Sequence, residues 1–186
     1  MKATRLVVLL FCAGCVHQPS SSEQSLILTA LSGHAEPLPG LLARSRFTVL
    51  VFVSPDCHCL AAHSARLNRL AATYTSRGVQ FLAVDSEPTT TIQIATAEAR
   101  KYALQFQLFI DQGARLANAF KAQYATYTLV LDGAGNIHYR GGLDSDIVDL
   151  HGDATRYVQN ALDDLLAGHE PHRPEGKTLG CVLRRS

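Results

Sequence analysis

The sequence predicts an α/β protein, a three-layer sandwich in which helices flank a central mixed β-sheet. Apolar, β-branched segments of strand length alternate with longer segments whose apolar residues recur at helical spacing. The 186 residues are 47% hydrophobic, enough to bury the core of one domain. Lysine and arginine (17) nearly balance aspartate and glutamate (16), and no basic run occurs, which argues against a nucleic-acid partner.

The first strand and helix are predicted from residues 46–78. Residues 46–53 (RFTVLVFV) are apolar and rich in β-branched side chains, which predicts a buried strand. Residues 54–56 (Ser-Pro-Asp) interrupt this run. Residues 57–77 contain no glycine or proline and show helical periodicity, so we expect an amphipathic helix that ends at Gly78.

The rest of the chain repeats the same two patterns. Further apolar runs predict strands, and a Gly-Ala-Gly turn joins the last two as a hairpin. Parallel neighbours in such a sheet require right-handed crossovers, whereas the hairpin adds antiparallel strands. The expected strands are residues 79–85, 106–111, 126–132 and 136–143, and the expected helices are residues 89–104, 113–122 and 153–167.

The amino-terminal residues resemble an export signal. Lys2 and Arg5 precede a short apolar run, residues 6–13. The length of this run is well below the roughly 20 residues that span a bilayer. Residues 12–15 (Cys-Ala-Gly-Cys) resemble a bacterial lipobox, with cysteine in place of the usual leucine. The resemblance implies cleavage before Cys15 and a lipid on its sulfur; a plain secretory signal, cut a few residues later, is the alternative.

The chain therefore divides into four predicted parts. These are a signal peptide (1–14), a lipidated flexible tether (15–25), one α/β domain (26–168) and a C-terminal tail (169–186) that carries Cys181. The tether contains serines and a proline without periodicity, which is typical of a flexible linker. The expected location is the cell envelope, with the protein lipid-anchored to a bacterial membrane and facing the periplasm or the exterior.

Two cysteines separated by one histidine mark the expected site, Cys57-His58-Cys59. Cys57 follows a buried strand and begins a helix, and ligands of open α/β sheets bind at the carboxyl ends of the strands. A helix N-terminus offers unpaired N–H groups and a partial positive charge, which favour a thiolate over a thiol. The position predicts that Cys57 has a lowered pKa and acts as a nucleophile.

Five stretches carry a family resemblance. They are LVFVSPDCHCLAAHSARLNRL, RGVQFLAVDSE, FQLFIDQGARLANAF, TYTLVLDGAGNIHYRGGLD and GKTLGCVL. In this order they resemble thioredoxin-like redoxins of the branch that includes alkyl hydroperoxide reductase and thiol-specific antioxidant proteins. The last stretch is similar to the Gly-Cys ending of exported bacterial redoxins. The resemblance covers residues 26–183 and implies a thioredoxin-like sandwich for the domain.

The resemblance implies a thiol-dependent oxidoreductase, thioredoxin-like or peroxiredoxin-like, that uses no cofactor. Cys57 takes the place of the attacking cysteine, on a protein or small-molecule disulfide or on a peroxide, with a thiol compound as electron donor. The family's second cysteine falls on Leu60, and the position of its cis-proline falls on Thr126. The residues expected to line the site are Ser54, Pro55, Asp56, His58 and Thr126.

Cys59 and Cys181 both remain open as the partner that resolves Cys57. A Cys57–Cys59 bridge would distort the helix, because residues two apart point about 200° away from each other. Cys181 reaches Cys57 if the tail, with Gly180 and its prolines, is mobile enough to fold back. A structural Cys59–Cys181 bond that leaves Cys57 free fits the sequence equally well.

A copper-binding chaperone of the same fold is the competing interpretation, with the Cys57-His58-Cys59 cluster as its centre. Cys59 and His63 are four residues apart and therefore share one helical face. Thiolate and imidazole ligands together suit copper(I) or zinc. The alternative metal site would consist of Cys57, Cys59 and His63.

Overall fold

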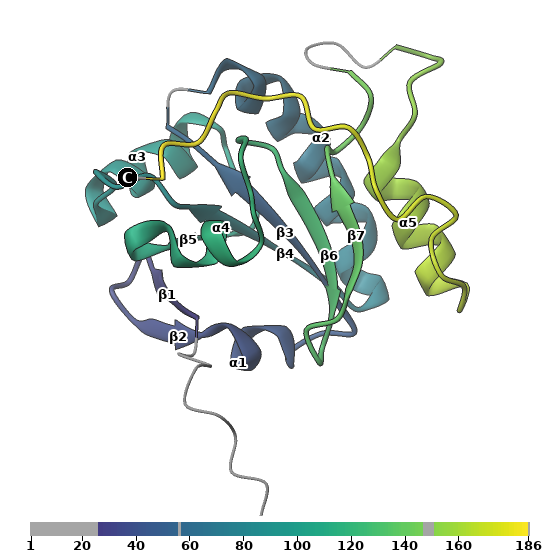
Figure 1. Cartoon of the computed structure of the whole chain (residues 1–186), viewed down its shortest axis with the longest axis horizontal. Helices are drawn as coiled ribbons and strands as arrows, with labels where there is room; N and C mark the ends of the chain where they lie inside the picture. Colours follow the sequence, from purple (N-terminus) through teal and green to yellow (C-terminus); the bar gives the residue numbers. More distant parts are fainter. Residues whose placement is uncertain (1–25, 56, 147–150, 186) are drawn as a thin grey trace, which may run out of the picture.

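The computed structural model describes residues 26–55, 57–146 and 151–185, which form the predicted alternation of strands and helices (Figure 1). The strands of this part are β1 (Ile27–Ala30), β2 (Ala35–Pro37), β3 (Phe47–Val53), β4 (Val79–Asp85), β5 (Gln107–Ile110), β6 (Thr128–Asp132) and β7 (Ile137–Gly141). The helices are α1 (Leu38–Leu42), α2 (His58–Tyr74), α3 (Ile92–Lys101), α4 (Arg115–Ala119) and α5 (Tyr157–Leu166). The predicted signal peptide, the tether with Cys15, and Asp56 lie outside the described residues.

The strands form one mixed sheet in the order β2-β1-β5-β4-β3-β6-β7. Strands β3, β4 and β5 run parallel to one another. The neighbours on both sides, β1 and β6, and the edge strands β2 and β7 pair antiparallel. All seven residues of β3 are buried, as expected for a central strand covered on both faces. The predicted α/β class with a mixed sheet is confirmed.

Helices cover both faces of the sheet (Figure 1). Helix α2 lies beside α3, where the side chain of Asn68 donates to the carbonyl of Ala103 (2.8 Å). It lies beside α5 as well, where the hydroxyl of Tyr74 donates to Asp163 (2.7 Å). Helix α4 lies on the opposite face, in front of the strands in Figure 1. None of the helices in the described part of the chain is long and apolar enough to cross a bilayer.

The start of the domain contains elements that the sequence patterns did not predict. Strands β1 and β2 are only four and three residues long, and α1 has five, so none is long enough to show a clear period. Helix α3 is shorter than the predicted 89–104. The hydroxyl of Thr91 accepts from the N–H of Ile94 (3.2 Å) and so caps the helix just before Ile92.

The C-terminal tail crosses the edge of the sheet at which β3 ends (Figure 1). Backbone bonds hold it at several points: the N–H of Arg140 donates to Pro174 (2.9 Å), and the N–H of Gly176 returns a bond to Arg140 (3.0 Å). Further along, the N–H of Ala125 donates to the carbonyl of Cys181 (2.8 Å). These paired backbone groups hold the tail folded back against the domain.

Two carboxyl groups, one on α3 and one at the end of β4, are buried next to each other. Glu98 on α3 is 2% exposed and Asp85 at the end of β4 is fully buried. Burial and repulsion from Asp85 raise the pKa of Glu98 to about 9. The folded protein therefore holds a proton on Glu98 at neutral pH.

Glu98→Gln is expected to flatten the dependence of stability on pH. Between pH 4.5 and about 9 the folded state binds more protons at Glu98 than the unfolded state does. The free energy of unfolding of the wild-type protein therefore falls as the pH rises through this range. The amide does not ionise, so this fall is absent from the variant. From pH 5 to pH 8, the difference in free energy of unfolding between variant and wild type should shift in favour of the variant by at least about 1 kcal/mol. Urea unfolding at both pH values measures this gain. Glu175→Gln, whose side chain is 74% exposed, is the control, and parallel pH profiles of Glu98→Gln and wild type would contradict the assignment.

Candidate active site

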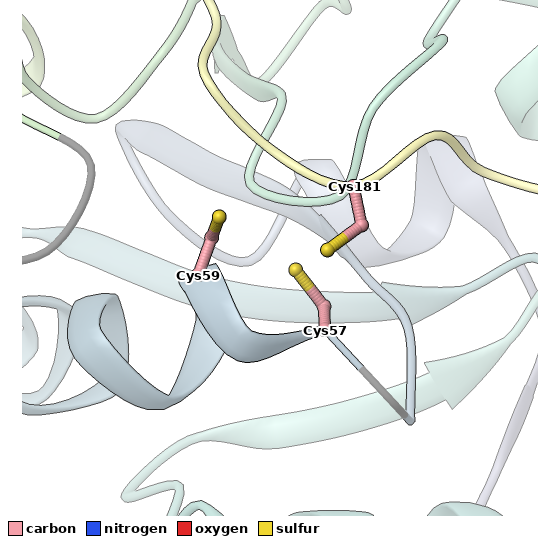
Figure 2. A group of neighbouring side chains, drawn as sticks. All are labelled: Cys57, Cys59 and Cys181. Carbon is pink, nitrogen blue, oxygen red and sulfur yellow. The ribbon is translucent and has the colours of Figure 1, made fainter.

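Three cysteines from two distant parts of the sequence meet at the start of α2 (Figure 2). The Sγ atoms of Cys57, Cys59 and Cys181 all lie within 4.8 Å of one another. All three are free thiols. The structure thus brings together the three cysteines that the sequence analysis selected for catalysis, while their roles remain predictions.

Cys57 lies immediately outside the helix. It is the N-cap of α2, with an extended backbone (φ −80°, ψ 109°), and it is fully buried. The helical geometry that would turn Cys57 and Cys59 away from each other does not apply, because only Cys59 is inside the helix. The expectation that these two sulfurs diverge is therefore wrong.

The loop that leads into Cys57 is held by two other elements. The hydroxyl of Ser54 donates to Glu87 (3.0 Å), and the N–H of Cys57 closes a turn onto the carbonyl of Ser54 (3.1 Å). The hydroxyl of Tyr102 donates to the carbonyl of Pro55 (2.8 Å). These bonds hold Ser54 and Pro55 in place next to Cys57.

Cys181 is held by a short antiparallel pairing between the tail and the segment that precedes β6. The N–H of Ala125 donates to Cys181 (2.8 Å), and the N–H of Leu183 donates to Gln123 (2.9 Å). These bonds fix the backbone from Cys181 to Leu183, and the side chain of Cys181 points toward Cys57 (Figure 2).

Thr126 and Gly180 allow the tail to come this close. Thr126 has a left-handed backbone (φ 71°), and its hydroxyl donates to the carbonyl of Leu179 (3.0 Å). A Cβ atom on Gly180 would lie 2.0 Å from the carbonyl oxygen of Ala125. Gly180 is therefore required for the close approach of the tail backbone to Ala125.

A buried carboxylate links the two parts of the site. Glu87 is 5% exposed and accepts from Ser54, in the loop before Cys57. It also pairs with the guanidinium of Arg184, three residues after Cys181 (2.8 Å). Glu87 was not predicted as a site residue, although an acidic residue two positions after a buried strand is a usable signal for the carboxyl edge of a sheet.

The three thiols differ in how readily they ionise. Burial raises the pKa of Cys57 to about 11, and it also raises the pKa of Cys59. The S–H of Cys57, followed by the backbone N–H groups of Cys59 and His58, lowers the pKa of Cys181. The prediction of a lowered pKa at Cys57 is wrong, because the first N–H groups of α2 stabilise a thiolate on Cys181 instead.

The two predicted histidines contribute differently. His58 has an exposed side chain and contributes to the site through its backbone. His63 is buried; its Nδ1 lies 2.6 Å from the carbonyl oxygen of Cys59, and its Nε2 lies 3.8 Å from Asp144. The structure does not assemble the alternative metal site of Cys57, Cys59 and His63, since both ring nitrogens of His63 face other partners.

The AhpC/TSA family matches residues 36–140, more than half of the chain. No curated protein matches. Among solved structures, a hypothetical protein of Sinorhizobium meliloti 1021 is 21% identical with a TM-score of 0.76, over 87% of this chain and 91% of that chain. An uncharacterised conserved protein of Geobacillus kaustophilus is 24% identical with a TM-score of 0.75, over 86% and 88%.

A third solved structure has an activity in its name. A secreted disulfide oxidoreductase of Mycobacterium tuberculosis is 19% identical with a TM-score of 0.52, over 61% of this chain and 80% of that chain. At such identities the likeness concerns the fold, and it confirms the predicted thioredoxin-like sandwich. The family match includes β3, α2 and the Cys57-His58-Cys59 motif but ends before Cys181. The chain belongs to the AhpC/TSA family.

Proposed function

We propose that the protein is a thiol oxidoreductase that acts on a disulfide or a peroxide through Cys57 and Cys181, with Cys59 beside them. The observation that carries the proposal is the convergence of three free thiols within 4.8 Å of one another at the carboxyl edge of the sheet. Membership of the AhpC/TSA family supports thiol-dependent redox chemistry and a thiol electron donor.

The proposed redox couple is Cys57 with Cys181. Figure 2 shows these two side chains pointing toward one another, while Cys59 projects from the first turn of α2. Oxidation joins the two sulfurs and transfers two electrons and two protons to a substrate disulfide, which leaves as two thiols. A peroxide would instead oxidise one thiolate to a sulfenic acid, which the second thiol converts to the disulfide with loss of water.

The geometry favours Cys181 for the first attack. Its sulfur is partly exposed and lies at the N–H groups that begin α2, whereas Cys57 is fully buried. In this scheme the thiolate of Cys181 attacks the substrate disulfide, and Cys57 then attacks Cys181 to release the second substrate thiol. The sequence-based assignment of the nucleophile to Cys57 stays a prediction, and the trapping experiment below distinguishes the two orders.

The proposal includes export and a lipid anchor. Residues 1–14 would direct secretion, a lipid on Cys15 would hold the protein to the membrane, and the tether would present the domain to the periplasm or the exterior. The residues Cys-Ala-Gly-Cys at 12–15 support this location. A Cys15→Ser chain that still fractionates with membranes would contradict it.

The test uses the full chain with Cys12 and Cys15 replaced by serine, so that three thiols remain. We expect glutathione disulfide or hydrogen peroxide to lower the thiol count from three to one, with the Cys57–Cys181 bond found by peptide mapping. Cys57→Ser and Cys181→Ser should each reduce turnover by about 100-fold or more, and Cys59→Ser much less. Cys57→Ser should accumulate a mixed disulfide on Cys181; accumulation on Cys57 in Cys181→Ser would reverse the order of attack. Unchanged turnover in both variants would overturn the proposed function.

A further inference from the structure

We propose that Cys57, Cys59 and Cys181, when reduced, bind one monovalent copper ion in a trigonal site made of three sulfurs. The set differs from the one predicted from sequence, because a cysteine of the tail replaces the histidine of the helix. The inference does not depend on the redox function, since it requires only that the three sulfurs meet.

The spacing of the sulfurs suits a metal centre. They lie within 4.8 Å of one another. Metal–sulfur bonds of about 2.3 Å in a trigonal arrangement place sulfurs roughly 4 Å apart. Side-chain rotations that move each sulfur by less than about 1 Å would therefore close the site around an ion, with no change in the backbone.

The donor set selects a soft ion of low coordination number. Within the described residues the group contains three cysteines and no histidine or carboxylate. Zinc takes four ligands, and hard cations prefer oxygen, whereas soft thiolates select copper(I). His63, the second histidine of α2, directs its ring nitrogens at the carbonyl oxygen of Cys59 and at Asp144.

The surroundings of the sulfurs favour a charged thiolate cluster. The sulfurs lie at the start of α2, where the partial positive charge of the helix N-terminus offsets part of the negative charge of the site. Cys57 is fully buried, while Cys59 and Cys181 are partly exposed, so an ion can reach the cluster from the solvent on the side of Cys59 and Cys181. The backbone of Cys181 is held in place, since its carbonyl accepts a hydrogen bond from the N–H of Ala125 (2.8 Å).

Copper binding and oxidation of the thiols exclude each other. A disulfide between any two of the three sulfurs leaves one thiol, which is too few for a trigonal site. The oxidised chain therefore serves as an internal control for the metal titration.

The experiment is an anaerobic titration of the reduced full chain, with Cys12 and Cys15 replaced by serine, with copper(I) against a chromogenic copper(I) chelator. We expect one copper per chain, three sulfur neighbours by X-ray absorption, and no binding to the oxidised chain. Each of Cys57→Ser, Cys59→Ser and Cys181→Ser should weaken binding by about 100-fold or more. His58→Ala, which changes an exposed side chain, should bind as wild type.

Cys59→Ser separates this inference from the proposed function. It should lose copper but still form the Cys57–Cys181 disulfide. Copper affinity that is unchanged in Cys181→Ser or Cys59→Ser would overturn the trigonal site, and so would a stoichiometric preference for zinc. If the wild-type chain showed no redox turnover, the proposed function would be overturned and the copper result would stand.

Discussion

Gly180→Ala is expected to lower the yield of the Cys57–Cys181 disulfide about tenfold or more while the sandwich stays folded. The new Cβ would lie 2.0 Å from the carbonyl oxygen of Ala125 and 3.1 Å from its carbonyl carbon. Both are backbone atoms next to β6 and cannot rotate away, so the tail has to lift from the domain. Cys181 is the next residue and moves with it, which separates its sulfur from Cys57.

The yield is measured by thiol titration after stoichiometric oxidation, and the fold by circular dichroism. Gly152→Ala is the matched control, because a Cβ at Gly152 meets no heavy atom of the described residues within 4 Å. We expect the control to oxidise as wild type. An undiminished Cys57–Cys181 bond in Gly180→Ala would show that the tail tolerates the change and that its close approach is unimportant.

Asp144→Ala is expected to reduce the free energy of unfolding by about 3–5 kcal/mol. The carboxylate lies 2.9 Å from the Nε of Arg66, and the two side chains are only 5% and 7% exposed. Arg66 also donates to the carbonyl of Asp146 (3.1 Å), so this ion pair ties α2 to the segment after β7. Removing the carboxylate takes away the negative charge that lies against the buried guanidinium of Arg66.

Urea unfolding measures the loss, with Asp153→Ala at an exposed position as the control. The control should change stability by less than about 0.5 kcal/mol. The double variant Arg66→Met/Asp144→Leu should recover most of the loss, because two apolar side chains then replace both members of the ion pair. If the double variant were as unstable as Asp144→Ala, lost packing would be the cause instead of the broken ion pair.

Local patterns predicted most of the central fold. The run at residues 47–53 becomes β3, whose seven residues are all buried. Gly78 adopts a left-handed backbone (φ 83°) and ends the helical segment, as its position indicated. Strands β1 and β2 could not be predicted, because three or four residues carry too little periodicity and pairing with β5 is a long-range contact.

The site was only partly predictable. Cys57 and Cys59 were evident from their place after a buried strand, and Cys181 was one candidate partner. The pairing of the tail with residues 123–125 was not evident, since it depends on the bond from Ala125 to Cys181 and on the space beside Gly180. Glu87, which contacts both halves of the site, was missed for the same reason.

By itself, the sequence determined the fold class, the order of the central elements and the position of two thiols at a strand–helix junction. These features depend on neighbours along the chain, whose spacing is printed in the sequence. The tertiary structure alone decided which sulfur the helix start stabilises. Cys57, the residue at the junction, becomes buried and harder to ionise, while Cys181, more than a hundred residues later, receives the N–H groups. Burial and the direction of those groups are set by how distant segments pack, and the acidity of a thiol follows them.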